Sequence, residues 1–313
     1  MLQRVTFRAM ASENEVQLHA RDAAHGRRAA QAAIDEVYRI EAKYSRYRFD
    51  SVLSRINASA GGEPVAIDAE THGLLAYADA CHRESGGLFD ATSGVLRRAW
   101  RFDSGRMPSD ADLARLLPLI GWRDVEWDAD RVRLPRAGME LDFGGFGKEY
   151  AVDRALAVLR EQGVESGLVN LAGDLAILAP HPDGSPWRMG IRHPRRDDAV
   201  VATLPVASGA IATSGDYERF MEVDGVRHCH VLHPRTGRSA RGFQSVTVHA
   251  ASCLVAGTAT TVAMLKGERD GLAWLDAMGQ PYLAVLESGE VRNTFVTPGS
   301  DPNETLHRGL TPV

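Results

Sequence analysis

A glycine-rich turn followed by a lysine is the feature of this sequence best suited to chemistry on an anion. The run reads Gly144, Gly145, Phe146, Gly147 and Lys148. Glycine allows a positive φ and lets a ligand approach the backbone closely. A helix opening at Lys148 would add free N–H groups and the positive end of its dipole. These residues predict a site for a phosphate-bearing ligand, and a tight strand-to-helix connection without a ligand is the simpler alternative.

The spacing of this turn excludes the two commonest nucleotide-binding loops. The turn lacks the GK[ST] ending at the spacing of the phosphate loop of nucleoside triphosphatases, and it lacks the G-x-G-x-x-G of dinucleotide-binding folds. A phosphate-bearing ligand therefore suits the residues, whereas an ordinary Rossmann site does not.

Regular elements on both sides must position the turn. A short apolar strand is expected from Leu141. Apolar residues at three- and four-residue intervals then predict a helix that opens at Lys148 and is capped by Gly163. Strands over 167–171 and 175–178 follow. The sequence thus predicts a strand, an anion-binding turn, a helix and a return strand in close succession.

Two further polar stretches allow two interpretations each. Residues 44–57 carry tyrosines, arginines and hydroxyls. They form either an exposed turn with Asp50 or Ser51 as a helix N-cap, or a wall for an aromatic ligand. Residues 88–94 place a carboxylate and two hydroxyls beside glycines, which suits a binding loop as well as the capping of the next helix.

The composition is that of an ordinary globular protein. The 313 residues are 44% hydrophobic with a net charge of −5, so the chain has no basic field for nucleic acid or an anionic membrane. Three widely separated cysteines indicate buried thiols rather than disulfides or a CxxC metal site. No apolar run approaches the roughly 18 residues of a membrane span, and the N-terminus lacks a secretory signal. We therefore expect a cytoplasmic protein.

Strands outnumber helices and mostly join as hairpins, which favours an α+β fold with mixed or antiparallel sheets in a single domain over 1–313. Further helices are expected at 23–40, 71–85, 95–100, 107–117 with Ser109 as N-cap, 253–265 and 270–278. Hairpins are expected to pair 5–10 with 15–18, 125–127 with 132–134, 219–223 with 226–231, and 282–287 with 290–297. The remaining strands are expected at 65–68, 187–191, 200–206, 209–213 and 243–250.

The order of the polar stretches is itself a pattern. YSRYRFDSVLSRIN, GGLFDATSG, LDFGGFGKEYAVDRA, GLVNLAGD, SGDYERF and HVLHPRTG follow one another, separated by apolar segments. In this the chain resembles the ApbE family of FAD:protein FMN transferases from about Phe7 to Gly279. The resemblance implies an α+β fold of mixed sheets, one FAD and magnesium. It also implies transfer of FMN from FAD to a threonine hydroxyl of a target flavoprotein subunit, with release of AMP.

The resemblance also implies roles for particular residues. His230 matches the family histidine implicated in catalysis, where it would orient or deprotonate the incoming threonine, a role that its ordinary pKa near 6.5 suits. Gly147 and Thr261 match metal-binding positions. The residues expected to bind the cofactor are Met10, Tyr47, Ser54, Asn57, Phe89, Asp90, Thr92, Gly144, Gly145, Phe146, Lys148, Asp174, Ser214, Gly215, Asp216, Arg235 and Thr236.

Three positions depart from the family pattern. Gly257 stands where relatives usually carry a metal-binding aspartate, although Thr261 is kept. His233 replaces the usual aspartate before Pro-Arg-Thr-Gly, and Glu149 replaces a common glycine after the lysine. Magnesium prefers oxygen ligands, at least one of them charged. A transferase whose missing ligand is replaced by Asp174, Asp216 or water is therefore one hypothesis. A non-catalytic flavin carrier and an FAD pyrophosphatase are the others.

Overall fold

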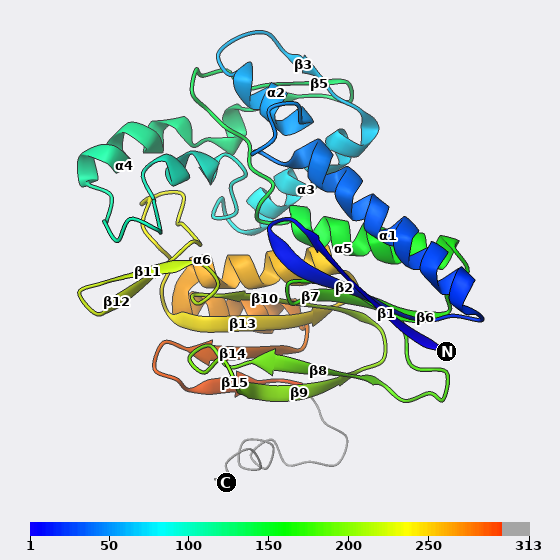
Figure 1. The fold of residues 1–313 in the computed structure, drawn as a ribbon. Coiled ribbons are helices and arrows are strands. Elements are labelled where there is room, and N and C mark those ends of the chain that lie inside the picture. Colours follow the sequence, from blue (N-terminus) through cyan, green and yellow to red (C-terminus); the bar gives the residue numbers. More distant parts are fainter. Residues whose placement is uncertain (296–313) are drawn as a thin grey trace.

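The computed structural model describes residues 1–295 and lays helices over one face of an eight-stranded sheet (Figure 1). The strand order is β1-β2-β6-β7-β10-β13-β14-β15, and every pairing is antiparallel. The α+β prediction is confirmed. The sheet strands are β1 Leu2–Ala9, β2 Ser12–His19, β6 Ser166–Leu171, β7 Asp174–Ala179, β10 Gly209–Gly215, β13 Phe243–Ala250, β14 Tyr282–Leu286 and β15 Val291–Asn293.

Smaller sheets and helices complete the fold. The remaining strands are β3 Val65–Ala66, β4 Glu126–Trp127, β5 Arg131–Arg133, β8 Trp187–Arg192, β9 Val200–Val206, β11 Phe220–Val223 and β12 Val226–Cys229. The helices are α1 Ala23–Tyr44, α2 Val52–Ala58, α3 Ala69–Glu84, α4 Asp110–Leu116, α5 Gly147–Glu161 and α6 Cys253–Met278. The predicted hairpins are found where they were expected, except that residues 296 and 297 of the last one lie outside the described part of the chain.

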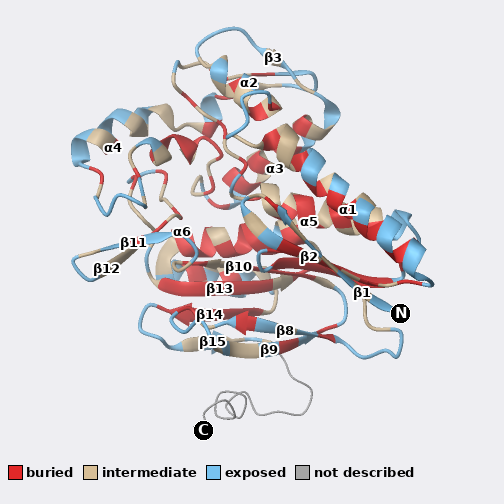
Figure 2. Ribbon diagram, viewed as in Figure 1, coloured by how far each residue is buried: buried red, intermediate tan, exposed pale blue. Residues whose placement is uncertain are grey.

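Both faces of the middle of the sheet are covered, which is why β6, β13 and β14 are buried along most of their length (Figure 2). In β6, Val169 packs into the core shared with α1, α5 and α6, whereas Leu168 packs against the β8–β9 hairpin. Successive side chains of a strand point to opposite faces. A strand covered on both sides therefore has a continuous apolar run, and this explains the sequences of β6 and β14.

One prediction about the glycine-rich turn was wrong: residues 141–143 do not form a strand. The side chain of Asn57 in α2 donates to the Leu141 carbonyl at 2.9 Å and accepts from the Leu141 N–H at 2.7 Å. The N–H of Asp142 donates to the carbonyl of Ala91 at 2.8 Å. Because a side chain and a loop take these backbone groups, no ladder forms here, and the segment is a loop held in place at two points.

Two smaller differences concern helices, whereas the expected helix caps are found. Residues 93–98 form a 3₁₀ helix within the stretch expected at 95–100. The two helices expected at 253–265 and 270–278 lie end to end as α6, interrupted at Gly267, whose φ of 74° only glycine adopts readily. Ser51 is the N-cap of α2, and Ser109 caps α4 as expected.

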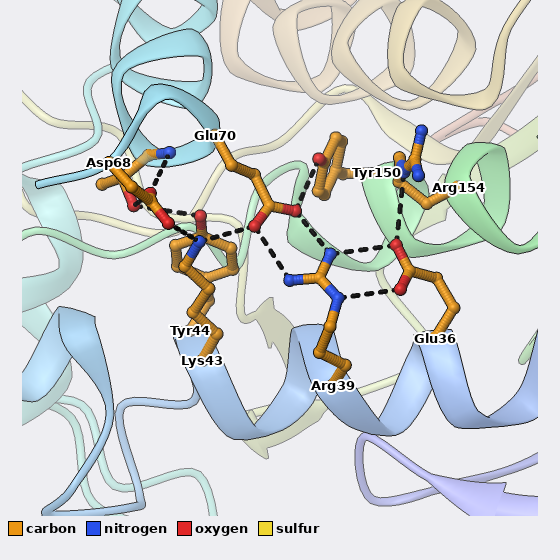
Figure 3. A network of polar contacts seen from close by, with 9 residues as sticks. Glu36, Arg39, Lys43, Tyr44, Asp68, Glu70, Tyr150 and Arg154 are labelled. Carbon is orange, nitrogen blue, oxygen red and sulfur yellow. Dashed lines mark hydrogen bonds and ion pairs between the residues drawn. The ribbon is translucent and has the colours of Figure 1, made fainter. Parts of the chain in front are cut away.

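A network of charged side chains holds α5 against its neighbours (Figure 3). Glu70 of α3 accepts hydrogen bonds from Arg39 and Lys43 of α1, each at 2.6 Å, and from the Tyr150 hydroxyl of α5 at 2.8 Å. Glu36 of α1 further pairs with Arg39 and with Arg154 of α5. The network fixes the outer side of the first turns of α5, so the residues on the other side of those turns face inward.

Two general expectations concern cysteines and membranes. Cys81, Cys229 and Cys253 are buried free thiols, as predicted. Within residues 1–295, no helix has both the length and the apolar character that a membrane span requires.

Candidate functional site

A cavity of about 730 Å³ opens beside the N-terminus of α5. It lies among the glycine-rich turn, the 88–97 loop, β7, β8, β10 and α6. The positively charged side chains that line it are Arg4, Arg97, Lys148, Arg188 and Arg192. Its volume suits a medium-sized organic ligand, and its cations suit an anionic one.

Lys148 and Asp174 form an ion pair in the wall of this cavity. The Lys148 ammonium lies 2.7 Å from Oδ2 of Asp174, whose side chain is almost fully buried. The other carboxylate oxygen accepts from the backbone N–H of Thr213 at 3.0 Å. Burial lowers the pKa of Lys148, but the carboxylates of Asp174 and Glu149 outweigh burial and hold it above its usual value. Lys148 is therefore a fixed positive charge at neutral pH.

Glu149 is the least expected residue of the site. It lines the cavity but is only 8% exposed, and its Oε2 atom has no hydrogen-bond partner among the described residues. Burial, and then the nearby Asp174 carboxylate, raise the pKa of Glu149 above its usual value. A Cβ atom added at Gly257 of α6 would lie 2.6 Å from Cγ of Glu149.

Hydroxyl groups from β10 and α6 contact one another, and two of them line the same cavity. Ser214 Oγ lies 2.8 Å from Thr260 Oγ1 and 3.3 Å from Thr261 Oγ1, and both Ser214 and Thr261 line the cavity. No group of three or more His, Cys, Asp or Glu side chains is arranged to hold a metal between residues 1 and 295. A cation here would therefore depend on two carboxylates together with hydroxyls, backbone oxygens or water.

His230 follows β12 and lines the same cavity. Its Nδ1 lies 3.2 Å from the carbonyl of Arg219, and burial is the main cause that lowers its pKa. A carbonyl only accepts, so Nδ1 carries the proton in the neutral ring and Nε2 keeps a free lone pair. This tautomer, inferred from the hydrogen bond, is the one a general base requires.

His233 stabilises the loop that follows His230 through a hydrogen bond with the backbone. Its Nδ1 accepts from the backbone N–H of Arg235 at 3.2 Å. A carboxylate at this position would offer the same acceptor. Arg235 itself reaches across to the carbonyl of Gly86. These contacts stabilise the loop, and neither residue lines the cavity.

Phe89 and Asp90 line the cavity next to the glycine-rich turn. Phe89 leaves no room for a side chain at position 145, where an added Cβ would lie 3.0 Å from its ring. One oxygen of Asp90 accepts from the backbone and hydroxyl of Thr92, and the other accepts from the N–H of Trp122. Asp90 and Thr92 therefore hold the loop in shape, which matches the capping interpretation of this stretch.

The structure brings about half of the predicted site residues together. Those that line the cavity are Phe89, Asp90, Gly144, Gly145, Lys148, Asp174, Ser214, Gly215, His230 and Thr261. Those that do not are Met10, Tyr47, Ser54, Asn57, Thr92, Phe146, Gly147, Asp216, Arg235 and Thr236.

Several residues of the second group have other contacts. Tyr47 is 78% exposed, and the Phe146 side chain is fully buried in the core. Asp216 forms a two-pronged ion pair with Arg195, both distances being 2.6 Å. The Met10 N–H donates to Glu41 at 2.7 Å. Their roles in ligand binding stay predictions.

The cavity also contains cations that the sequence motifs did not indicate. Arg188 and Arg192 lie on the same exposed face of β8, and both line the cavity. Their even spacing on a strand was a usable signal for a shared face. The sequence did not indicate which residues lie near that face, because β8 packs against strands of the central sheet that are distant in sequence.

The chain is similar to known proteins of one family over most of its length. The ApbE family model matches residues 10–286. The FAD:protein FMN transferase of Vibrio cholerae is 31% identical over 252 residues, which cover 79% of this chain and 75% of that protein. The protein of the same name from Treponema pallidum is 31% identical over 267 residues, covering 78% and 74% respectively.

Two solved structures share the fold over nearly their whole length. The ApbE protein of Thermotoga maritima superimposes with a TM-score of 0.87 at 31% identity, covering 98% of this chain and all of that one. The apo flavinyl transferase ApbE of Pseudomonas stutzeri gives a TM-score of 0.83 at 29% identity, covering 99% and 98%.

Proposed function

The chain belongs to the ApbE family, and from this we propose that it is an FAD:protein FMN transferase. In the proposed reaction, FMN passes from FAD to a threonine hydroxyl of a target flavoprotein subunit, and AMP is released. The observation that carries the proposal is the single cavity in which Lys148, Asp174 and His230 meet beside the start of α5. It combines a fixed positive charge for a pyrophosphate with a neutral histidine for a hydroxyl.

The cations of the cavity would bind and orient the pyrophosphate of FAD. Lys148 is held in place by Asp174, so its charge does not depend on the ligand. The start of α5 adds the partial positive charge of a helix N-terminus. Gly144 and Gly145 keep the turn free of side chains. Cβ atoms added at these positions would lie 3.0 Å from Arg97 and from Phe89 respectively, so larger residues would crowd the cavity lining. Together these groups favour a pyrophosphate next to the turn.

The proposed transfer is a substitution at phosphorus. The threonine oxygen attacks the phosphorus on the FMN side of the pyrophosphate, and a new P–O bond forms. The P–O bond to the AMP phosphate breaks, and AMP leaves with that bridging oxygen. Nε2 of His230 accepts the proton of the hydroxyl, because its Nδ1 is engaged with the carbonyl of Arg219.

The oxygen donors of the cavity fit a magnesium ion. Glu149 has a buried oxygen without a partner, and Asp174, Ser214 and Thr261 line the same wall. Magnesium binds oxygen ligands and commonly keeps several waters, so a site with few protein ligands suits it. When bound, it would supply positive charge to the phosphate oxygens as the P–O bond breaks.

The test is turnover with FAD, Mg²⁺ and a flavoprotein subunit that carries the acceptor threonine. Mass spectrometry detects the FMN adduct and chromatography detects AMP. We expect both products from the wild type. We expect His230→Asn to lower the rate roughly 100-fold or more, because the general base is lost. His228→Asn is the matched control, since His228 lies on β12 but outside the cavity lining.

The other outcomes separate the competing functions. AMP without an adduct would indicate water as the acceptor and therefore an FAD pyrophosphatase. Bound FAD without either product would indicate a flavin carrier. Equal rates for His230→Asn and the wild type would remove His230 from the proposed chemistry.

A further inference from the structure

Glu149 and Gly257 face each other on neighbouring helices. One turn further along α5, the Asp153 carboxylate accepts from the N–H groups of Cys253 and Leu254 at 2.8 and 3.0 Å. Residues four apart lie on the same face of a helix. Position 149 precedes Asp153 by four residues and position 257 follows Cys253 by four. The capping contact between the two helices therefore also sets positions 149 and 257 opposite each other.

Only one of these two positions has room for a side chain. A Cβ atom at 257 would lie 2.6 Å from Cγ, 2.8 Å from Oε1 and 3.0 Å from Cδ of Glu149. Distances this short require one group to move. The Glu149 carboxyl group thus fills the space into which a side chain at 257 would extend. A carboxylate can reach this point from α5 or from α6, but not from both.

The position of Glu149 is costly without a ligand. A buried carboxylate needs partners for its lone pairs. Oε2 of Glu149 has none, and the nearby ammonium of Lys148 pairs with Asp174 instead. Glu149, Ser214 and Thr261 all line the cavity, and the Ser214 and Thr261 hydroxyls lie 3.3 Å apart, so a cation bound by the Glu149 carboxylate would have further oxygen ligands available in the same cavity.

We infer that Glu149 is the charged ligand of a divalent, oxygen-binding cation such as Mg²⁺, and that position 257 is glycine to leave room for it. The inference rests on the proposed function only in assigning the cation to the FAD reaction. It accounts for two departures from the family pattern with one cause: the carboxylate has moved from α6 to α5. Asp174 and Thr261 complete the side of the cavity to which the ion binds.

The first experiment measures the metal directly. Mn²⁺ binding is followed by electron paramagnetic resonance, with Mg²⁺ as competitor, on the full chain with and without FAD. We expect Glu149→Gln to weaken binding roughly tenfold or more, because the charge is lost while the volume is kept. Glu161→Gln, at the exposed end of the same helix, is the control and should bind Mn²⁺ like the wild type.

Thermal unfolding distinguishes a ligand from a structural ion pair. In EDTA, Glu149→Gln should unfold at the same or a higher temperature than the wild type, because it replaces a buried carboxyl group that has an unpartnered oxygen. Added Mg²⁺ should raise the unfolding temperature of the wild type and leave that of the variant nearly unchanged. A variant that is less stable in EDTA and still stabilised by Mg²⁺ would make Glu149 a structural residue and overturn the inference.

A residue exchange gives the sharpest test. Gly257→Asp alone should destabilise the protein, because its side chain overlaps Glu149, and Glu149→Gly alone should lose Mn²⁺ affinity. The double variant Glu149→Gly/Gly257→Asp should regain both stability and Mn²⁺ binding, since it returns one carboxylate to the same place. A double variant that binds Mn²⁺ no better than Glu149→Gly would overturn the inference.

The metal-binding experiments test the inference about Glu149, and the transfer assay tests the proposed function, so either one can be contradicted without the other. If Mn²⁺ binding follows these expectations but the wild type forms no FMN adduct, the site is supported and the proposed function is lost. If Glu149→Gln binds Mn²⁺ as tightly as the wild type, the inference is overturned whatever the transfer activity.

Discussion

At the scale of single residues, the proposed chemistry depends on polar side chains that already have a hydrogen-bond or ion-pair partner within the protein. Nδ1 of His230 is engaged with the Arg219 carbonyl, which leaves Nε2 free. Lys148 is paired with Asp174, so it presents a permanent charge without needing to find a partner. These partners hold the side chains in place, so the side chains need to reorganise less at the moment of reaction. Glu149 is the exception, because one of its oxygens is buried without a partner.

The protonation of His230 predicts the pH dependence of FMN transfer. Burial holds the pKa of His230 below its ordinary value of 6.5. As the pH falls through this lowered pKa, the ring gains a proton and can no longer accept one, so the rate declines. We expect a plateau near neutral pH and an acid limb with its midpoint below 6.5. Initial rates of adduct formation under saturating FAD, from about pH 5 to pH 8, measure this.

A midpoint above 6.5 would contradict the assignment, because it would require a group that stabilises the charged imidazole. The control is His228→Asn, which should keep the same profile since His228 lies outside the cavity lining.

At the scale of elements, the site lies where the N-terminus of α5 meets the side of α6. The start of α5 carries Lys148 and Glu149, and α6 carries Thr261. Asp153 joins the helices, because a carboxylate on α5 caps the first N–H groups of α6. Capping groups usually belong to the helix they cap. Here the cap fixes the distance between two halves of a binding site.

Asp153→Ala should therefore affect both stability and the site. We expect a loss of about 2 kcal/mol in the free energy of unfolding, from two hydrogen bonds to a carboxylate. We also expect weaker Mn²⁺ binding and a higher KM for FAD. Urea unfolding and the metal titration measure the two effects.

Ser252→Ala is the matched control, since Ser252 is the N-cap residue of the same helix and its hydroxyl accepts from the N–H of Val255 at 3.4 Å. Ser252→Ala should lower the free energy of unfolding by about 1 kcal/mol and leave Mn²⁺ binding unchanged. If both variants lose only stability, Asp153 does not position the site.

At the scale of the whole molecule, a charged network supports the helix that carries the site. Glu70 receives Arg39 and Lys43 from α1 and Tyr150 from α5, so it links three helices (Figure 3). The hydrogen bond from Arg39 is the main cause that lowers the pKa of Glu70 to about 2. The stability that ionised Glu70 contributes is therefore complete above its ordinary pKa of 4.5 and is lost as the pH falls from there toward 2.

Glu70→Gln tests this contribution. We expect the variant to be about 1 kcal/mol less stable at neutral pH, a modest value because the network is partly open to solvent. The difference from the wild type should shrink as the pH falls below 4.5. Urea unfolding at several pH values measures it, with the exposed Glu63→Gln as control. A difference that stays constant down to about pH 2 would show that the charge of Glu70 is not the cause.

The sequence alone determined most elements, the α+β class and the resemblance to the ApbE family. These depend on local rules: the spacing of apolar residues predicted α1, and Asp224-Gly225 predicted the β11–β12 turn. The strand expected at Leu141 does not form, because the side chain of Asn57, which is distant in sequence, hydrogen-bonds to the backbone N–H and carbonyl of Leu141.

Only the tertiary structure decided which polar residues share the cavity. In sequence, Glu149 and Gly257 were two separate departures from a family pattern, and only Gly257 put the metal in doubt. In space the Glu149 carboxyl group occupies the volume that Gly257 leaves open. No local pattern carries this information, because the contact is set by how α5 and α6 pack through Asp153. Packing determines which side chains meet, and a site assembled from distant segments can be read only after packing is known.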